Sequence, residues 1–396
     1  MRVYNGVDVL HRPVKAIVPY KEITIMQLGT HIMPQYTYVK IRRKVYLCLQ
    51  QNLAVLVWLL AIKGRPLGFG RESLMTTFES PWLLASWLTN LLRYQFHLWN
   101  NDSRLELPFY GNVCLLVNRG YKIFDLQRER VIKIFKEDVD TSSIKSEIER
   151  VRNVGRYDFA PVVRRWDIEA RWYEEDYVNG SPITAADMKT YSKNYYQYAA
   201  SCIESMIFCE GLQVTNVAEY VNHMMAMFLG RLLEDGSDMS SVRPIQDFMH
   251  MLADDLCSAG DLQVHLALSH GDFDHCPVLR TKQGIKVIDW EYMDHRSLLF
   301  DLYNYFMVQL FWRHTVPNLV SEIESALSSL QARLALRTPE VAGSLRPLAR
   351  VYRWLYYIER ICSVVELRGR DVKCMRRWMD AFNDYEEMVA GAPSAL

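Results

Sequence analysis

The sequence predicts an α+β protein in which a small antiparallel sheet with one helix precedes a larger helical region that carries a β insertion. Three observations lead to this prediction. Short β-prone runs separated by turn residues fill residues 108 to about 180. Helical periodicity dominates from about 184 to the end, and a β-like stretch over residues 261–293 interrupts it. At 396 residues the chain is long enough for two or three domains, or for one two-lobed fold.

Composition excludes several classes of protein. The 46 basic and 46 acidic side chains cancel, so no overall positive charge favours a nucleic-acid partner. The eight cysteines form neither a CxxC pair nor a zinc-type spacing with histidine, which is typical of a reduced intracellular chain. The N-terminus "MRVYNGVDVLHRPVK" lacks a continuous apolar stretch, so no secretory signal is predicted. A cytoplasmic location follows as an expectation.

Residues 1–105 are interpreted as an N-terminal extension with strands first and then two helices. The apolar run Leu53–Ile62 has about half of the roughly 20 residues that a membrane-spanning helix needs. A second apolar segment, "PWLLASWLTNLLRYQFHLW", has a helical stripe of leucine and tryptophan. Both segments favour buried core helices. Peripheral membrane contact through residues 45–100 is the alternative interpretation.

Residues 106–180 predict the small sheet and its helix. The runs "NVCLLV", "YKIFDL" and "RVIKIF" are separated by "NRG" and "QRER", which suit tight turns, so a three-stranded antiparallel meander is expected. "DTSSIKSEIERVRNVG" has helical spacing and closes on Gly155, which favours a helix end. The aromatic-rich stretch "FAPVVRRWDIEARWYEEDYVNGSPI" then returns to extended structure.

Residues 181–396 predict the helical region. Thr184 and Asp187 in "TAAD" form a capping box, and helical periodicity continues to residue 259. Two apolar β-like runs follow, "VHLAL" and "IKVIDW", and helices resume at about residue 297.

Candidate catalytic residues emerge from what phosphoryl transfer requires, namely a cation on the phosphates, a carboxylate on the metal and a carboxylate at the attacking hydroxyl. Lys133 lies in "RVIKIF" on the face opposite the two isoleucines, and Glu147 follows on the predicted helix. A strand lysine held by a helix glutamate can be aimed at phosphate oxygens. An ordinary surface salt bridge is the competing interpretation, and Lys136 with Glu149 is the alternative register.

Two aspartates complete this set. Asp272 follows a strand-like run in "LSHGDFDHCPVL" and lies in a loop, where a carboxylate can act as a general base. Asp289 follows the apolar run "IKVI". A short hairpin between them would let both acids face one cleft, which is the geometry that a metal-bound triphosphate needs. A lone aspartate at a strand end is more often a turn or cap residue.

Three motifs together resemble a known family. "LSHGDFDHCPVL", "VIDWEYM" and "FDLYNY" are similar to the catalytic and metal-binding segments of the aminoglycoside phosphotransferase and choline kinase group, within the protein-kinase-like superfamily. "HGDF" followed by a cysteine also resembles kinases that phosphorylate heptose in lipopolysaccharide cores. The resemblance covers residues 108–390 approximately. It implies a two-lobed kinase-like fold with an N-lobe and hinge at 106–180 and a C-lobe at 181–396.

The resemblance also implies roles for individual residues. Asp272 would be the catalytic base, Asp289 the magnesium-binding acid, and Lys133 the contact to the α- and β-phosphates of ATP with Glu147 as its partner. Five further residues would support the nucleotide or the catalytic loop. Asp176 and Tyr177 would belong to the hinge "YEEDYVNG", Gly120 would form the turn of the phosphate loop, His270 would brace the catalytic loop and Asp301 would hold its backbone. A full glycine-rich pattern is absent.

Pro277 departs from the family pattern. Many relatives have asparagine five residues after the catalytic aspartate as a second metal ligand, and proline offers neither a side-chain oxygen nor an N–H. Asp274 is the first candidate to replace it, since hard Mg²⁺ prefers oxygen, with His275 and Glu291 as alternatives. A second metal that is dispensed with, or lost catalysis, would also account for the proline.

The expected function is therefore ATP- and Mg²⁺-dependent phosphorylation of an alcohol on a small molecule, sugar or glycolipid. The similarity to heptose kinases favours a sugar or glycolipid over choline. The alternative is a pseudokinase that acts as a nucleotide-binding or scaffold module. No feature of the sequence indicates the oligomeric state.

Overall fold

The chain forms two compact units. Unit 1 comprises Met1–Ile183 and Val278–Glu291, and unit 2 comprises Thr184–Pro277 and Tyr292–Leu396. The structure is a computed structural model, and it describes residues 25–28, 31–42, 44–51, 55, 56, 59, 104–182, 192–234, 239–258, 260–273, 277–312, 318–368 and 371–391. A short segment late in the sequence thus belongs to the first unit.

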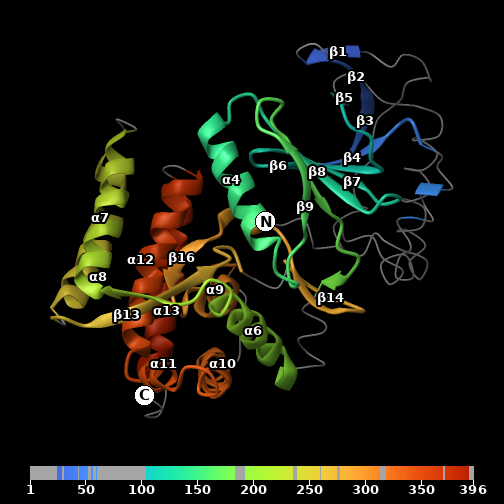
Figure 1. Cartoon of the computed structure of the whole chain (residues 1–396). Helices are drawn as coiled ribbons and strands as arrows, with labels where there is room; N and C mark the ends of the chain where they lie inside the picture. Colours follow the sequence, from blue (N-terminus) through green and yellow to red (C-terminus); the bar gives the residue numbers. More distant parts are fainter. Residues whose placement is uncertain are drawn as a thin grey trace, which may run out of the picture. The chain divides into compact units, whose positions relative to one another are not determined.

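The centre of unit 1 is an antiparallel sheet of eight strands in the order β5-β3-β4-β6-β7-β8-β10-β9 (Figure 1). The strands are β3 (Tyr36–Arg42), β4 (Val45–Cys48), β5 (Arg104–Leu107), β6 (Val113–Val117), β7 (Gly120–Asp125), β8 (Arg130–Phe135), β9 (Val163–Asp167) and β10 (Trp172–Asp176). A separate hairpin consists of β1 (Ile25–Leu28) and β2 (His31–Pro34). With its helices, the chain has the α+β class that the sequence predicted.

The predicted meander is present as β6, β7 and β8, which pair in sequence order. The turn between β6 and β7 contains only Asn118 and Arg119, since Val117 pairs with Gly120. A Cβ atom at Gly120 would lie 1.8 Å from the carbonyl oxygen of Ile134. Glycine is therefore explained here by the close approach of β8 to β7.

The predicted helix is α4 (Thr141–Val154), which lies beside the sheet in Figure 1. Its N-cap Asp140 accepts a hydrogen bond from the Ser143 N–H at 3.1 Å. At the other end, the N–H of Gly155 donates to the Val151 carbonyl at 3.0 Å. One apolar stripe is buried, comprising Ile144, Ile148, Val151 and Val154. The helix thus begins and ends where the sequence indicated.

Strands from the first 107 residues belong to the same sheet as the meander, whereas the sequence suggested a separate extension over residues 1–105. β4 pairs with β6, placing Val45 opposite Leu115, and β3 pairs with both β4 and β5. The alternating "YTYVKIR" identifies a strand, but partners this far away along the chain leave no local signal. The boundary expected near residue 105 is therefore not a break in the sheet.

Part of the apolar run Leu53–Ile62 is in the core of unit 1. Leu56 and Leu59 are buried in a hydrophobic cluster with residues of β4 and β6. This burial favours the core interpretation for these two residues. The second apolar segment, at 81–99, lies outside the described residues. Among the helices that the structure describes, none has both the length and the apolar character needed to cross a bilayer.

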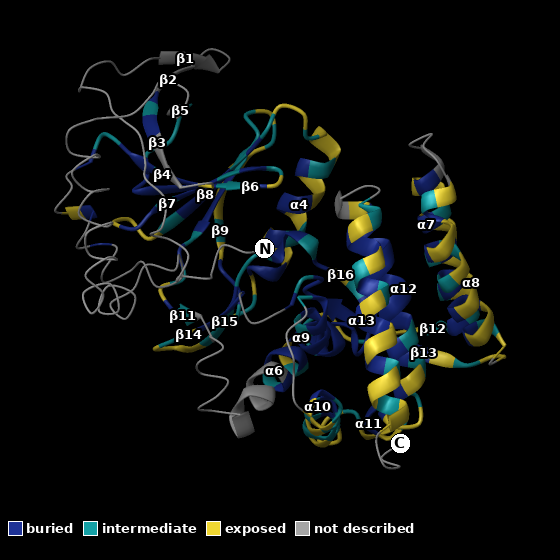
Figure 2. Cartoon of the chain, turned by 180° about the vertical axis from the view of Figure 1, so that it is seen from behind, coloured by how far each residue is buried: buried dark blue, intermediate teal, exposed yellow. Residues whose placement is uncertain are grey.

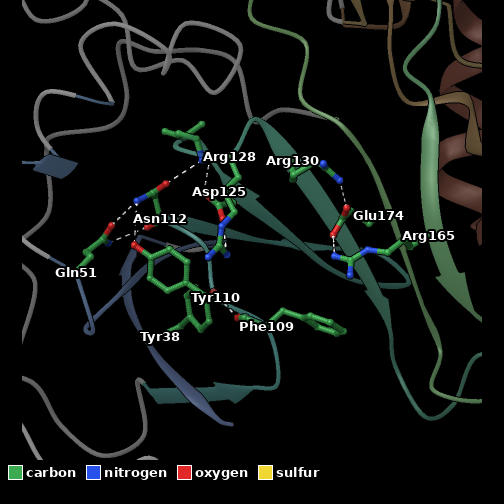
Figure 3. Close-up of polar contacts among 11 residues, drawn as sticks. Tyr38, Gln51, Phe109, Tyr110, Asn112, Asp125, Arg128, Arg130, Arg165 and Glu174 are labelled. Atoms are coloured by element: carbon green, nitrogen blue, oxygen red, sulfur yellow. Dashed lines mark hydrogen bonds and ion pairs between the residues drawn. The ribbon is translucent and has the colours of Figure 1, made fainter. Parts of the chain in front are cut away.

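Buried amides connect this early segment to the meander (Figure 3). Asn112 Nδ2 donates to Gln51 Oε1 at 2.8 Å, and Gln51 Nε2 donates to the Asn112 carbonyl at 3.0 Å. Asn112 Oδ1 in turn accepts from the backbone N–H of Leu126 at 2.8 Å. The Tyr38 hydroxyl of β3 donates to the Phe109 carbonyl at 2.8 Å. Satisfied polar groups of this kind specify one arrangement of the segments.

A three-stranded sheet completes the described strands of unit 1. It consists of β11 (Ser181–Pro182), β14 (Val278–Thr281) and β15 (Gly284–Val287), in the order β11-β14-β15. β14 and β15 are the short hairpin predicted between Asp272 and Asp289. The N–H of Val287 donates to the Phe159 carbonyl at 2.7 Å, which attaches this hairpin to unit 1.

Unit 2 is mostly helical around a small sheet in the order β12-β13-β16. Its strands are β12 (Gln213–Asn216), β13 (Gln263–Ser269) and β16 (Asp294–Ser297). Its α-helices are α6 (Ser192–Ile207), α7 (Val217–Glu234), α8 (Arg243–Cys257), α9 (Phe300–Phe311), α10 (Leu319–Leu334), α11 (Pro339–Leu345), α12 (Ala349–Arg368) and α13 (Val372–Gly391). Short 3-10 helices lie at Met239–Ser241 and Trp290–Tyr292.

Helix α9 is the central element of unit 2. Every residue of this helix except Gln309 is buried, as its dark blue colour in Figure 2 shows. A helix that is apolar on all sides must be covered on all sides by other elements. α9 carries the "FDLYNY" motif, so that motif lies in a packed interior. The capping box at Thr184 and Asp187 lies outside the described residues.

Replacing Gly120 with alanine is expected to lower the free energy of unfolding by about 1–3 kcal/mol, because the new Cβ would overlap the Ile134 carbonyl. The control is Gly230→Ala, an exposed position inside α7 with open space around the new atom. There the free energy of unfolding should rise by about 0.5–1 kcal/mol. Urea denaturation measures both changes. Equal stability of Gly120→Ala and the natural chain would contradict the close approach.

Candidate functional site

A buried ion pair joins β8 to α4 in unit 1. Lys133 is 1% exposed, and its Nζ lies 2.5 Å from Glu147 Oε1. Glu147 is fully buried, and its Oε2 accepts a hydrogen bond from Arg119 at 3.0 Å. The Tyr173 hydroxyl donates to Glu147 Oε1 at 3.5 Å. Strand alternation directs Lys133 to the face opposite its isoleucine neighbours, and helical spacing presents Glu147 among buried apolar residues.

The structure decides between the two registers that the sequence left open. Lys133 and Glu147 are buried and paired, whereas Lys136 lies at the surface and donates to the Asn118 carbonyl at 3.1 Å. Glu149 is exposed. A surface salt bridge was the competing interpretation of the pair, and the burial of both partners excludes it.

A second buried lysine lies directly opposite the first. Lys122 of β7 pairs in register with Lys133 of β8, and it is 4% exposed. Its Nζ lies 2.5 Å from Asp289 Oδ1 and 4.0 Å from Glu291 Oε2. Glu291 also contacts Lys133 Nζ. Like charges directly opposite on adjacent strands repel, so the carboxylates are what make this pair of lysines tolerable.

Asp289 has an unusual backbone. Its φ angle is 68°, in the left-handed region that residues other than glycine seldom adopt. Such strained conformations are concentrated at functional sites, where the surrounding structure enforces them. The carboxylate itself is 21% exposed and is thus the most accessible of the acids that contact the two lysines.

Burial and the neighbouring charges shift the pKa values of Lys122 and Glu175. Burial alone would lower the pKa of Lys122, but Asp289, Glu291 and Glu175 outweigh it and hold that pKa well above the ordinary value. Burial raises the pKa of Glu175 in β10 to about 7, although Lys122 partly offsets the effect. Burial and the nearby carboxylates likewise raise the pKa of Tyr173. This network of opposite charges is out of contact with most solvent.

The other residues predicted to bind the nucleotide, Asp176, Tyr177 and Gly120, also belong to unit 1. The N–H of Asp176 donates to the Val162 carbonyl at 3.0 Å, and the N–H of Tyr177 donates to the Glu129 carbonyl at 2.9 Å. Both amides of this predicted hinge are thus used within the unit. The Asp176 carboxylate accepts from Arg164 at 2.5 Å and 2.8 Å. Gly120 begins β7 and has the packing role described above.

Asp272 belongs to unit 2 and lies in a loop whose backbone N–H groups are bound by a side chain of α9. Asp301 of α9 accepts hydrogen bonds from the N–H groups of His270 at 2.7 Å and Gly271 at 3.2 Å. Gly271 has φ of 82°, and a Cβ there would lie 2.3 Å from the Tyr292 carbonyl oxygen. Only glycine satisfies both conditions. Burial raises the pKa of Asp301, and the nearby His270 opposes this change.

Two further side chains hold the same loop. Arg360 of α12 donates to the Gly271 carbonyl at 3.2 Å and to Asp272 Oδ1 at 3.4 Å. Asn304 donates to the Phe273 carbonyl at 2.9 Å. The Asp272 side chain is 36% exposed, so its loop is fixed while its carboxylate stays accessible. Such a carboxylate can act as a base towards a hydroxyl.

The described residues do not suit a metal ion at Asp289 in this arrangement. Oδ1 of Asp289 is bound by the Lys122 ammonium, and the neighbouring Glu291 is bound by Lys133. Within the part of the chain that the structure describes, no three histidine, cysteine or acidic side chains are placed to hold a metal. Asp274 and His275, the predicted replacements for the ligand lost at Pro277, lie outside that part.

Sequence reasoning missed several residues of these networks. Lys122 had a usable signal, because the hairpin of β7 and β8, in which Asp125 pairs with Arg130, places it opposite Lys133. Glu175 lies within the predicted hinge "YEEDYVNG", but nothing local shows that it is buried. Arg119 lies in the turn, and Arg360 is one of several arginines on a long helix. Their partners are distant in sequence, so no motif identifies them.

The sequence matches no protein-family model. It matches no curated protein either. Solved structures to which the chain is similar include choline kinase from Cryptosporidium parvum, at 12% identity over 72% of this chain and 88% of that one, with a TM-score of 0.47. Choline kinase from Streptococcus pneumoniae is 16% identical over 68% of this chain and 91% of that one, with a TM-score of 0.44. Ethanolamine kinase from Plasmodium vivax is 12% identical over 68% of this chain and 80% of that one, with a TM-score of 0.45. The first two come from the group that the motifs resemble.

Replacing Lys133 with methionine is expected to lower the free energy of unfolding by about 3–5 kcal/mol, because the carboxylates of Glu147 and Glu291 lose a buried ammonium. The control Lys136→Met removes a surface lysine from the same chain segment and should change it by less than about 0.5 kcal/mol. Urea unfolding measures both. A Lys133→Met protein as stable as this control would contradict the pairing.

The raised pKa of Glu175 predicts a pH dependence. The folded chain keeps a proton on Glu175 up to about pH 7, whereas the unfolded chain releases it near the ordinary value of 4.5. The free energy of unfolding should therefore fall as pH rises from about 4.5 to 7, on the order of 1 kcal/mol per pH unit. Glu175→Gln should remove this part of the slope in urea titrations across that range. An unchanged slope would show that Glu175 ionises normally.

Proposed function

We propose that the chain is an ATP-dependent phosphotransferase that phosphorylates a hydroxyl group of a small molecule, sugar or glycolipid. One observation carries the proposal: Lys133 is held between Glu147 and Glu291, with Asp289 and Lys122 beside them. Burying charge costs free energy that the attraction between partners seldom exceeds, so stability alone does not explain such a network. Networks of this kind are characteristic of functional sites.

Lys133 is proposed to contact the phosphates of ATP. A lysine ammonium on a rigid strand, already oriented by two carboxylates, loses little freedom when it binds an anion. It also stabilises the charge that spreads over the phosphoryl oxygens in the transition state. The resemblance implies Mg²⁺ at Asp289, but the Lys122 ammonium already binds Oδ1 of this residue, so no step is assigned to a metal there.

Asp272 is proposed to orient the acceptor hydroxyl and accept its proton. The proposal rests on the "HGD" motif and on the loop that presents it. Asp301, Arg360 and Asn304 fix the backbone on both sides of Asp272, so the carboxylate needs no reorganisation at the moment of reaction. Its partly exposed position suits contact with a polar substrate.

The acceptor is proposed to be a sugar, a glycolipid or a small alcohol. The motifs of the chain support this class of acceptor and do not distinguish among its members. Choline, ethanolamine and glucosamine appear in the names of similar solved structures and are suitable first probes. A sugar phosphorylated in preference to the amino alcohols would agree with the similarity to heptose kinases.

A second candidate is a nucleotide-binding or scaffold module without transferase activity. One specific observation favours it, since both proposed catalytic carboxylates are bound by cations. Asp289 pairs with Lys122 at 2.5 Å, and Asp272 pairs with Arg360 at 3.4 Å. Pro277 also favours this candidate, because it stands where the resemblance implies the second metal ligand.

Turnover measurements separate the two candidates. With ATP and a panel of choline, ethanolamine, glucosamine and further sugars, acceptor-dependent ADP release should fall about 10²–10⁴-fold in Asp272→Asn, the range for loss of a general base. Asp289→Asn should also lose activity, whereas Asp261→Asn, an exposed acid of unit 2, should not. Mass spectrometry identifies the phosphorylated acceptor.

The opposite result would support the module. In that case the chain binds ATP, releases no ADP with any acceptor of the panel, and shows the same nucleotide affinity in Asp272→Asn as in the natural protein. Activity that survives both aspartate substitutions would contradict the assignment of the site.

A further inference from the structure

The Lys122 ammonium binds the carboxylate of Asp289, the residue that the family resemblance assigns to a divalent cation. Its side chain is 5% exposed, and Nζ lies 2.5 Å from Asp289 Oδ1. The next carboxylate, Glu291 Oε2, is 4.0 Å away and is also bound by Lys133. The two acids of the "IDWE" segment therefore already share two lysine charges.

The position of Lys122 is fixed by the sheet. β7 is paired along its length with β6 and with β8, so the strand cannot rotate to point the side chain elsewhere. The next residue, Ile123, is fully buried on the opposite face. The two-residue turn before Gly120 leaves no slack in which the register could slip. The sheet thus places the positive charge of Lys122 beside Asp289 without any bound ion.

Among the groups in direct contact with one another, charge is balanced without a metal. Lys122, Lys133 and Arg119 contribute three positive charges to the network. Asp289, Glu291 and Glu147 contribute three negative charges in direct contact with them. A divalent ion at Asp289 would add two charges beside an ammonium that cannot leave the strand, and the repulsion between these cations opposes its binding.

We propose that Lys122 replaces a divalent cation at Asp289, so that unit 1 presents two lysines, rather than a lysine and a metal, to the phosphates of a nucleotide. The second half of this inference rests on the proposed function, and the first does not. Pro277 agrees with it: the resemblance implies an amide metal ligand at this position, and an enzyme that needs less metal charge can dispense with that ligand.

Direct measurement of Mn²⁺ binding tests the replacement. Mn²⁺ is titrated into the full chain without nucleotide, and free Mn²⁺ is followed by electron paramagnetic resonance. The natural chain should show no Mn²⁺ site that depends on Asp289. Lys122→Met should gain one that binds at least tenfold more tightly than the natural chain, and Lys122→Met/Asp289→Asn should lose it. Lys122→Arg keeps the charge and should behave as the natural chain does.

Two controls accompany these variants. Lys136→Met removes a surface lysine of the same unit and should leave Mn²⁺ binding unchanged. Thermal unfolding shows whether each variant is folded, and Lys122→Gln is the alternative if the methionine variant is not. The proposal is overturned if the natural chain binds Mn²⁺ through Asp289 as tightly as Lys122→Met does. A folded Lys122→Met or Lys122→Gln chain without a new site overturns it as well.

A nucleotide arm distinguishes this inference from the proposed function. ADP binding is measured by calorimetry in EDTA and in Mn²⁺. The natural chain should bind ADP with less than a threefold difference between the two conditions, and Lys122→Met should bind at least tenfold more tightly with Mn²⁺. A natural chain that binds ADP only with metal overturns the two-lysine arrangement. Absence of ADP binding in every sample contradicts the proposed function, while the Mn²⁺ titration still decides the role of Lys122.

Discussion

The arrangement of unit 1 depends on the pairing of one buried ammonium, that of Lys133. A charge this far from water is tolerated only when carboxylates satisfy it, and Glu147 and Glu291 do so. Meeting that requirement brings β8, α4 and the segment after β15 together, although they are far apart in sequence. Lys122 and Asp289 extend the same network, with Asp289 held in a strained backbone conformation. Local strain and buried charge thus occur in the same few residues.

Unit 2 follows the same rule with backbone groups in place of ammonium ions. The buried carboxylate of Asp301 is satisfied by two N–H groups of the "HGD" loop. Glu359, also buried, accepts from the N–H of Ser297 at 2.7 Å and from the Tyr220 hydroxyl at 2.6 Å. Its neighbour Arg360 binds the loop that carries Asp272. Asp301 therefore holds the irregular loop that carries Asp272, which is why this loop can present its side chain in one orientation, and Glu359 connects α12 to β16 and α7.

Local patterns predicted the parts that depend on neighbours in sequence. The three β-prone runs became β6, β7 and β8, the helix ended at Gly155, and a hairpin lies between Asp272 and Asp289. Alternation placed Lys133 on the correct face, and helical spacing placed Glu147 within reach. The participation of β3, β4 and β5 in the main sheet was not predictable in this way, because strand partners so far away in the chain have no periodicity in common.

The sequence by itself determined the types and order of the elements and the chemical groups available, since these follow from side-chain periodicity, turn residues and motif spacing. Tertiary structure alone decided which acid meets which base. Lys133 meets Glu147 and Glu291, whereas Lys122 meets Asp289. The physical reason is that charges select partners only after burial removes water, and burial depends on strands and helices that the chain brings together from distant positions.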